Sequence, residues 1–124
     1  MKAVLIHGYD TAPILTEVAR PVPGAGEVLV RVRAAALNPL DVKLRRGFMH
    51  QFFPLKFPYA LGTDIAGEIE EIGRQVEGWR PGDHVIARLD PVAGGGAAQF
   101  AVVPSSQLVK APATLGLEEA AGIP

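Results

Sequence analysis

Short apolar runs, separated by turn-forming residues, predict a mainly β domain. In the clearest run, residues 27–36, Val28, Val30 and Val32 fall on one side and two arginines on the other. This period of two is typical of a strand with one buried face. Further strands are expected at residues 1–7, 14–18, 63–72, 84–89 and 97–103, with an extended piece at 108–112. Six to eight short strands of this kind are typical of a partly open β-barrel.

Two stretches carry helix signals. Residues 38–46 begin with Asn38, which can cap a helix, and with Pro39, which suits a first turn, and they end before Gly47. Asp41 in this first turn favours the positive end of the helix dipole. A second short helix is expected to begin at residue 117, so the domain should have one or two short helices.

Glycine and proline mark the connections between these elements. Gly67, inside the strand at 63–72, indicates a bulge or a close approach of another backbone. Residues 80–83, Arg-Pro-Gly-Asp, predict a type I or type II turn. Residues 94–96 are three glycines and predict a flexible turn. They do not form a phosphate-binding loop, because no Lys-Ser/Thr follows and no Gly-x-Gly-x-x-Gly occurs in the chain.

Composition narrows the choice of function. The 124 residues suit one domain, and 48% hydrophobic residues suffice for a globular core. A net charge of −1 gives no electrostatic reason to bind nucleic acid or an acidic membrane. The chain has no cysteine, which excludes disulfides and cysteine zinc sites and suits the cytoplasm. No apolar run is long enough for a signal peptide or a membrane-spanning helix.

A series of motifs follows in a distinctive order. They are Met1-Lys2-Ala3, Pro21-x-Pro23-Gly24-x-Gly26-Glu27-Val28, Ala35-Ala36-Leu37-Asn38-Pro39-Leu40-Asp41, Gly62-Thr63-Asp64-x-Ala66-Gly67, Gly73-x-x-Val76, Pro81-Gly82-Asp83-His84-Val85, Gly96-Ala97-Ala98-Gln99-Phe100 and Leu117-Glu118-Glu119-Ala120-Ala121. In this order they resemble the GroES-like N-terminal domain of the medium-chain dehydrogenase/reductase superfamily, in its branch of zinc-independent quinone oxidoreductases. The resemblance covers essentially the whole chain.

The resemblance implies a fold and a reaction. Residues 1–124 would form a GroES-like, partly open β-barrel, and the Rossmann domain that holds most of the NADPH would be absent from this chain. The family reaction is hydride transfer from NADPH to a small-molecule quinone or to an α,β-unsaturated carbonyl. The isolated domain is therefore expected to be inactive, and the full-length protein to be a homodimer through the other domain. The alternative is a stand-alone GroES-like binding or structural module.

Zinc divides the superfamily. Its zinc-dependent alcohol dehydrogenases have a Cys at the position of Asn38 and Gly-His-Glu at the position of residues 62–64, which read Gly-Thr-Asp here. The three histidines of the chain share no motif. Catalytic zinc normally needs three protein ligands, so no metal is expected.

The resemblance also assigns site residues, each with an alternative. Asn38, Pro39 and Lys43 would contact the cofactor, and Asn38, Lys43 and Thr63 would be catalytic. The residues themselves equally suit other roles. Asn38 can be a helix cap, Lys43 a solvated helix lysine, and Thr63 a plain strand start.

A substrate pocket is expected from four further residues: Phe48, Phe52, Tyr59 and Asp64. Pockets are largely apolar and aromatic, so the phenylalanines suit this role, but they could equally plug the barrel. Tyr59 could donate a proton, although packing against Leu61 is the favoured interpretation. Asp64 could pair with an arginine beneath the cleft or simply start a strand.

Overall fold

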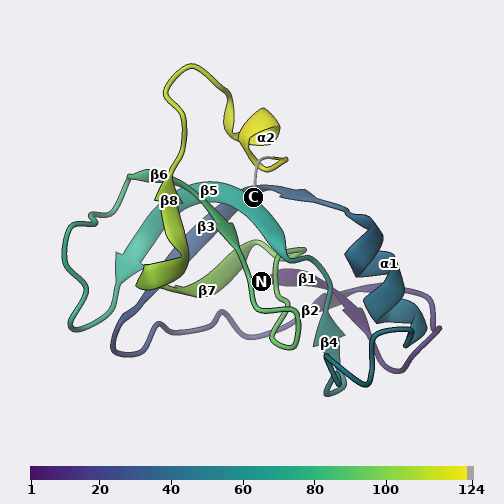
Figure 1. Ribbon diagram of the computed structural model, residues 1–124. Coiled ribbons are helices and arrows are strands. Elements are labelled where there is room, and N and C mark those ends of the chain that lie inside the picture. The colour runs from purple at the N-terminus through teal and green to yellow at the C-terminus, as the bar shows by residue number, and fades with distance from the viewer. Residues whose placement is uncertain (123–124) are drawn as a thin grey trace.

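The computed structural model describes residues 1–122, and within them eight strands form two antiparallel sheets (Figure 1). One sheet has the order β2 (Ile14–Glu17), β1 (Lys2–Ile6) and β4 (Tyr59–Ala60). The other has the order β7 (Phe100–Pro104), β3 (Glu27–Ala36), β5 (Asp64–Ile72), β6 (His84–Arg88) and β8 (Leu108–Lys110). The mainly β class predicted from the apolar pattern is therefore confirmed.

The two sheets are joined along one seam and do not close into a barrel. Residues 97–99 run beside β1, with a single bridge between Ala3 and Ala98. The Val4 N–H donates to the carbonyl of Ala97 at 2.8 Å, and the Gln99 N–H donates to Lys2 at 3.0 Å. This pairing explains why β7 begins three residues later than the apolar pattern predicted, because residues 97–99 pair with the other sheet.

Helices lie at two edges of this framework (Figure 1). α1 (Pro39–Arg46) follows β3 directly and lies beside the three-stranded sheet, and α2 (Leu117–Ala120) lies against β3 and β5. A single 3₁₀ turn, η1 (Ser105–Gln107), connects β7 to β8. Both predicted helices are confirmed, whereas η1 and the two-residue strand β4 were not predicted.

The first half of β5 is buried on both faces. Its Ile65 and Ile69 pack into the main cluster with Val30 and Val85, while Ala66, on the opposite face, packs with Ala120 of α2. β5 is thus covered on both faces, and the side under α2 carries small residues because the helix lies close to it. Burial on this scale is the main stabilising term of the fold.

Gly67 occupies a place where only glycine fits. A Cβ there would lie 2.2 Å from the carbonyl oxygen of Arg31 on β3. The β3–β5 register also shifts between Val32 and Ala34, next to this contact. The bulge and the close backbone approach predicted from the sequence are therefore both present.

Candidate functional site

α1 begins as the sequence predicts. Asn38 stands at the N-cap in an extended conformation, Pro39 lies in the first turn, and Asp41 completes a capping box. In this box the backbone N–H of Asn38 donates to Oδ2 of Asp41 at 2.8 Å. Gly47 ends the helix in the left-handed conformation with φ 81°. Asn38 thus stands at the predicted N-cap position, but its side chain makes no cap hydrogen bond, and the cap is made by Asp41 to the Asn38 backbone.

The helix is held in place by one buried face. Leu44 packs into a cluster with Ile6, Leu55, Tyr59 and Leu61, which ties α1 to β1 and β4. Pro39 and Lys43 lie on the opposite, exposed side. The buried face therefore fixes the helix, while the exposed face is free to meet a ligand or another domain.

Asp64, at the start of β5, is the centre of a chain of polar contacts. Its side chain is only 2% exposed. Oδ2 accepts a short hydrogen bond from Nδ2 of Asn38, and Oδ1 accepts from Nε of Arg88 at 3.1 Å. Asp64 and Arg88 are directly opposite in the β5–β6 register. The predicted pairing of Asp64 with an arginine is confirmed.

Thr63 lies at the same place, one residue before β5. It is buried, and its carbonyl oxygen accepts the N–H of Leu89 at 2.5 Å. The structure therefore brings Asn38, Thr63 and Asp64 together at the junction of α1 with the start of β5. It places Lys43 on the solvent side of α1, one turn after Pro39.

Asp41 is a second buried carboxyl group, at 4% exposure. Its Oδ2 is bonded to Asn38, but its Oδ1 is buried without any hydrogen-bond partner. Burial raises the pKa of Asp41 above its ordinary value of 3.8, and the charge of Asp64 adds to this effect. The backbone N–H groups of Asn38 and Gly62 act in the opposite direction without cancelling it.

Tyr59 is buried and its phenol is already engaged. Its O–H donates to the carbonyl of Pro91 at 2.7 Å, and its ring packs with Leu61 and Ile6. Burial raises the pKa of Tyr59 to about 12, and the charges of Asp41 and Asp90 contribute. These contacts match the favoured interpretation, in which Tyr59 packs against Leu61.

The four residues expected to line a substrate pocket lie in two different environments. Phe48 and Phe52 are 69% and 74% exposed, so they do not plug the core. Tyr59 and Asp64 are both buried. The phenylalanines could form a wall only for a ligand or domain that covers them, and the buried pair could act only from beneath. A shared substrate pocket for the four stays a prediction.

Two residues of this region were missed by the sequence reasoning. One is Arg88, the partner of Asp64, which only the register of β5 on β6 identifies. The other is Tyr9, whose hydroxyl accepts the N–H of Leu55 at 3.0 Å and whose ring meets Phe57 edge-on at 5.0 Å. Nothing in the local pattern around Tyr9 indicates this long-range role.

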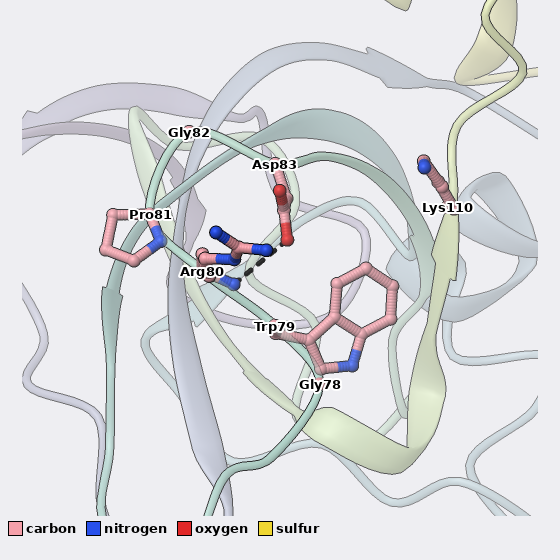
Figure 2. A pocket seen from close by; sticks show the side chains of 7 residues that line it. All are labelled: Gly78, Trp79, Arg80, Pro81, Gly82, Asp83 and Lys110. Atoms are coloured by element: carbon pink, nitrogen blue, oxygen red, sulfur yellow. Dashed lines mark hydrogen bonds between the residues drawn. The ribbon is translucent and has the colours of Figure 1, made fainter.

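A separate hollow lies at the other end of the β5–β6 hairpin (Figure 2). It has a volume of about 580 Å³ and is lined by residues of the connecting loop and by Lys110. Its Asp83 accepts the backbone N–H of Arg80 at 2.9 Å, and its Trp79 packs against the main core. These contacts are those of a turn, and the hollow has no part in the polar chain at Asp64.

The residues at the polar chain do not fit a zinc ion. Asn38 and Asp64 are bonded to each other, and Asp64 also to Arg88, so no set of three free ligands is presented. Within residues 1–122, no group of three or more His, Cys, Asp or Glu side chains could hold a metal. The same residues contain no helix that is long and apolar enough to cross a membrane.

Comparison with known proteins gives consistent matches. The family model described as "Alcohol dehydrogenase GroES-like domain" matches residues 24–113. The chain is 40% identical to the chloroplastic quinone-oxidoreductase QR1 of Triphysaria versicolor, covering 100% of this chain and 39% of the relative. It is 38% identical to the mitochondrial NAD(P)H oxidoreductase RTN4IP1 of Danio rerio, covering 79% of this chain and 28% of the relative.

The fold also matches solved structures. An alcohol dehydrogenase superfamily protein from Novosphingobium aromaticivorans superposes with a TM-score of 0.93 at 35% identity. The match covers 100% of this chain and 38% of that protein. The chain therefore spans about two fifths or less of the length of these relatives.

Proposed function

The chain belongs to the family of alcohol dehydrogenase GroES-like domains, and we propose that it is the N-terminal catalytic domain of an NADPH-dependent, zinc-independent oxidoreductase. The substrate would be a small quinone or an α,β-unsaturated carbonyl compound. The observation that carries this proposal is the buried polar chain from Arg88 through Asp64 to Asn38. It occurs in a chain whose relatives are named as quinone and NAD(P)H oxidoreductases.

Asn38 is the residue that would meet the cofactor. Its amide has two donor hydrogens and an acceptor oxygen, and Asp64 takes one of the hydrogens. The half-buried side chain therefore keeps a donor and an acceptor for the polar edge of a nicotinamide or a ribose. Pro39 and Lys43, on the exposed side of α1, would extend this contact. Such a fixed group contributes mainly by orientation, since a reacting pair gains most from correct placement.

The cofactor supplies the hydride, and this chain would orient and polarise the acceptor. Lys43 offers an exposed positive charge for a carbonyl oxygen on which negative charge develops. Thr63 would act at the floor of the site, beside Asp64. Phe48 and Phe52 would form the apolar wall of the substrate pocket, with Tyr59 and Asp64 beneath it.

In this proposal a separate Rossmann domain would bind most of the cofactor, and this chain would orient the acceptor. Dinucleotide affinity comes chiefly from a Rossmann turn and the following helix N-terminus, and this sequence has no Gly-x-Gly-x-x-Gly. The 124-residue chain alone would bind NADPH weakly and would not turn over. A larger protein that contains it would be a homodimer. Localisation in the cytoplasm stays a prediction, since the relatives named above are chloroplastic and mitochondrial.

The test joins this chain to the cofactor domain of the Triphysaria relative and measures NADPH consumption with a quinone and with an enone. We expect turnover by the joined protein, none by the 124-residue chain, and no loss after treatment with a metal chelator. Steady turnover by the isolated chain would refute the division of labour. A joined protein that binds NADPH but reduces neither acceptor would favour the stand-alone binding module.

Asn38→Ser provides the matched control in the joined protein. Serine keeps an N-cap residue on α1 but removes the amide. Loss of one well-placed hydrogen-bonding group lowers kcat by about 10²-fold. If the serine variant instead keeps both its stability and its activity, Asn38 is a cap and nothing more.

A further inference from the structure

Two buried aspartates lie beneath Asn38, and their surroundings are unequal. Asp64 receives a side-chain hydrogen bond from Asn38 on one oxygen and from Arg88 on the other. Asp41 receives the backbone N–H of Asn38 on Oδ2, while its Oδ1 has no partner among the residues that the structure describes. Asp64 thus has the contacts of a carboxylate, and Asp41 lacks half of them.

The cation that lines the same groove as Asp41 is engaged elsewhere. Arg45 lies one turn further along α1, at the same groove, but its Nη1 donates to the carbonyl of Thr11 at 3.1 Å. Arg88 donates from Nε to Oδ1 of Asp64 at 3.1 Å. The groove itself has a volume of about 160 Å³, and its other lining residues are apolar: Pro13, Leu37, Val42 and Leu61.

The remaining titratable groups near Asp41 disfavour a second negative charge. Asp64, at the start of β5, is itself an acid, and its charge raises the pKa of Asp41. Tyr59, on β4, is a neutral phenol whose pKa the charge of Asp41 raises in turn. An ionised carboxylate with one buried, unpaired oxygen is costly. Protonation removes the charge and leaves a neutral hydroxyl at that oxygen, which costs much less to bury.

We propose that Asp41 is a positioning residue that holds a proton on Oδ1 and fixes the backbone of Asn38 through Oδ2. Asp64 is then the single carboxylate beneath Asn38, and it holds the side-chain amide. The neutral Asp41 binds the backbone of Asn38 and the charged Asp64 binds its side chain, which together set the direction of the remaining donor and acceptor of the amide. When Asp41 loses its proton, a second charge forms beside Asp64, and these two hydrogen bonds hold Asn38 less firmly. A catalytic role for this positioning rests on the proposed function, whereas the protonation of Asp41 does not.

The composition of the chain makes a direct test possible, because Asn38 is its only asparagine. Selective ¹⁵N-asparagine labelling of the 124-residue chain gives one side-chain amide signal, and ¹³C-aspartate labelling reports every carboxyl group. The carboxyl signal of Asp41 is identified by its loss in Asp41→Asn. We expect this signal to titrate with a midpoint above 3.8, the ordinary value. The Asn38 amide shift should follow the same midpoint and should lose that response in Asp41→Ala.

Two results would overturn the proposal. One is an Asp41 carboxyl signal whose titration midpoint lies at the ordinary value of 3.8. The other is an Asn38 amide shift that does not change between about pH 4 and about pH 8. If Asp41 only packs α1, the Asn38 amide signal will not follow the titration of the Asp41 carboxyl signal.

The two variants also separate charge from shape in thermal unfolding. Asp41→Asn imitates the protonated acid and should keep the wild-type Tm, whereas Asp41→Ala should lower Tm by about 5 °C through loss of the cap. The wild-type Tm should fall as pH rises through the pKa of Asp41, and the asparagine variant should lack this fall. Equal losses in both variants would show that the ionised form is required. None of these readouts uses NADPH or turnover, so failure here is distinct from failure of the reductase proposal.

Discussion

The β5–β6 hairpin has two ends with the same kinds of residue and very different access to water. Each end has an aspartate, an arginine and a glycine with positive φ: Asp64, Arg88 and Gly62 (φ 97°) at one end, and Asp83, Arg80 and Gly82 (φ 93°) at the other. At the first end the aspartate is buried; at the second the polar groups surround an open hollow of about 580 Å³ (Figure 2). Residues of the same kinds therefore lie in opposite environments at the two ends.

The difference matters because hydrogen bonds and charges gain strength where water is excluded. An exposed ion pair contributes about 0 to 1 kcal/mol, but a buried carboxylate that loses its partners is costly. The polar chain at Asp64 therefore ties its residues to fixed positions, whereas the residues at the turn remain replaceable. Paired substitutions at the two ends test this contrast.

The largest difference is expected between the two glycines. Gly62→Ala and Gly82→Ala both place a side chain at positive φ, which costs about 1 to 2 kcal/mol. At Gly62 the new Cβ would also lie 2.7 Å from the backbone nitrogen of Ala97, whereas at Gly82 nothing lies within 4 Å. Overpacking adds about 1 to 3 kcal/mol, so Gly62→Ala should lose about 4 kcal/mol in total. Urea unfolding of both variants measures this, and equal losses would show that the backbone at Gly62 relaxes freely.

The two aspartates form the second pair. Asp64→Ala removes two hydrogen bonds to a charged acceptor and should cost about 3 kcal/mol. Asp83→Ala removes one exposed hydrogen bond to the turn backbone, from Arg80 at 2.9 Å, and should cost about 1 kcal/mol. The measurement is again the free energy of unfolding. A loss at Asp83 as large as that at Asp64 would mean that the turn, and not the polar chain, is the rigid part of the hairpin.

The sequence predicted the individual strands and helices but not which polar residues would be buried together. β3, with its exact bounds, follows from the alternation of valine and arginine, and α1 follows from Asn38, Pro39 and Gly47. These signals are local because propensity and capping act over a few residues. The sequence also indicated that Asp64 might pair with an arginine, but Arg88 could be identified only from the register of β5 on β6.

The unequal environments of Asp41 and Asp64 were beyond reach for a related reason. Both are single aspartates near the start of an element, and the residues beside them do not show which one will find a cation. That depends on Arg45 turning to Thr11 and Arg88 reaching Asp64, and both contacts span more than 20 residues of sequence. The exposed positions of Phe48 and Phe52 likewise depend on how Tyr9 holds their loop, through its hydrogen bond from the N–H of Leu55.

The smallest expected effect is that of Tyr59→Phe on the free energy of unfolding. It should change sign with pH, because Tyr59 lies at the buried end of the hairpin. Near neutral pH the variant loses the hydrogen bond to Pro91, which costs about 1 kcal/mol. The pKa of Tyr59 is raised from 10.0 to about 12, so between these values the unfolded chain ionises first. The folded state then binds more protons, and wild-type stability must fall as pH rises through this window. Phenylalanine has no proton to lose, so the two stability curves should converge and cross in alkaline solution. If the two curves of unfolding free energy against pH stay parallel, the pKa of Tyr59 is not raised on folding. The phenol would then be as accessible to water as the groups at the turn.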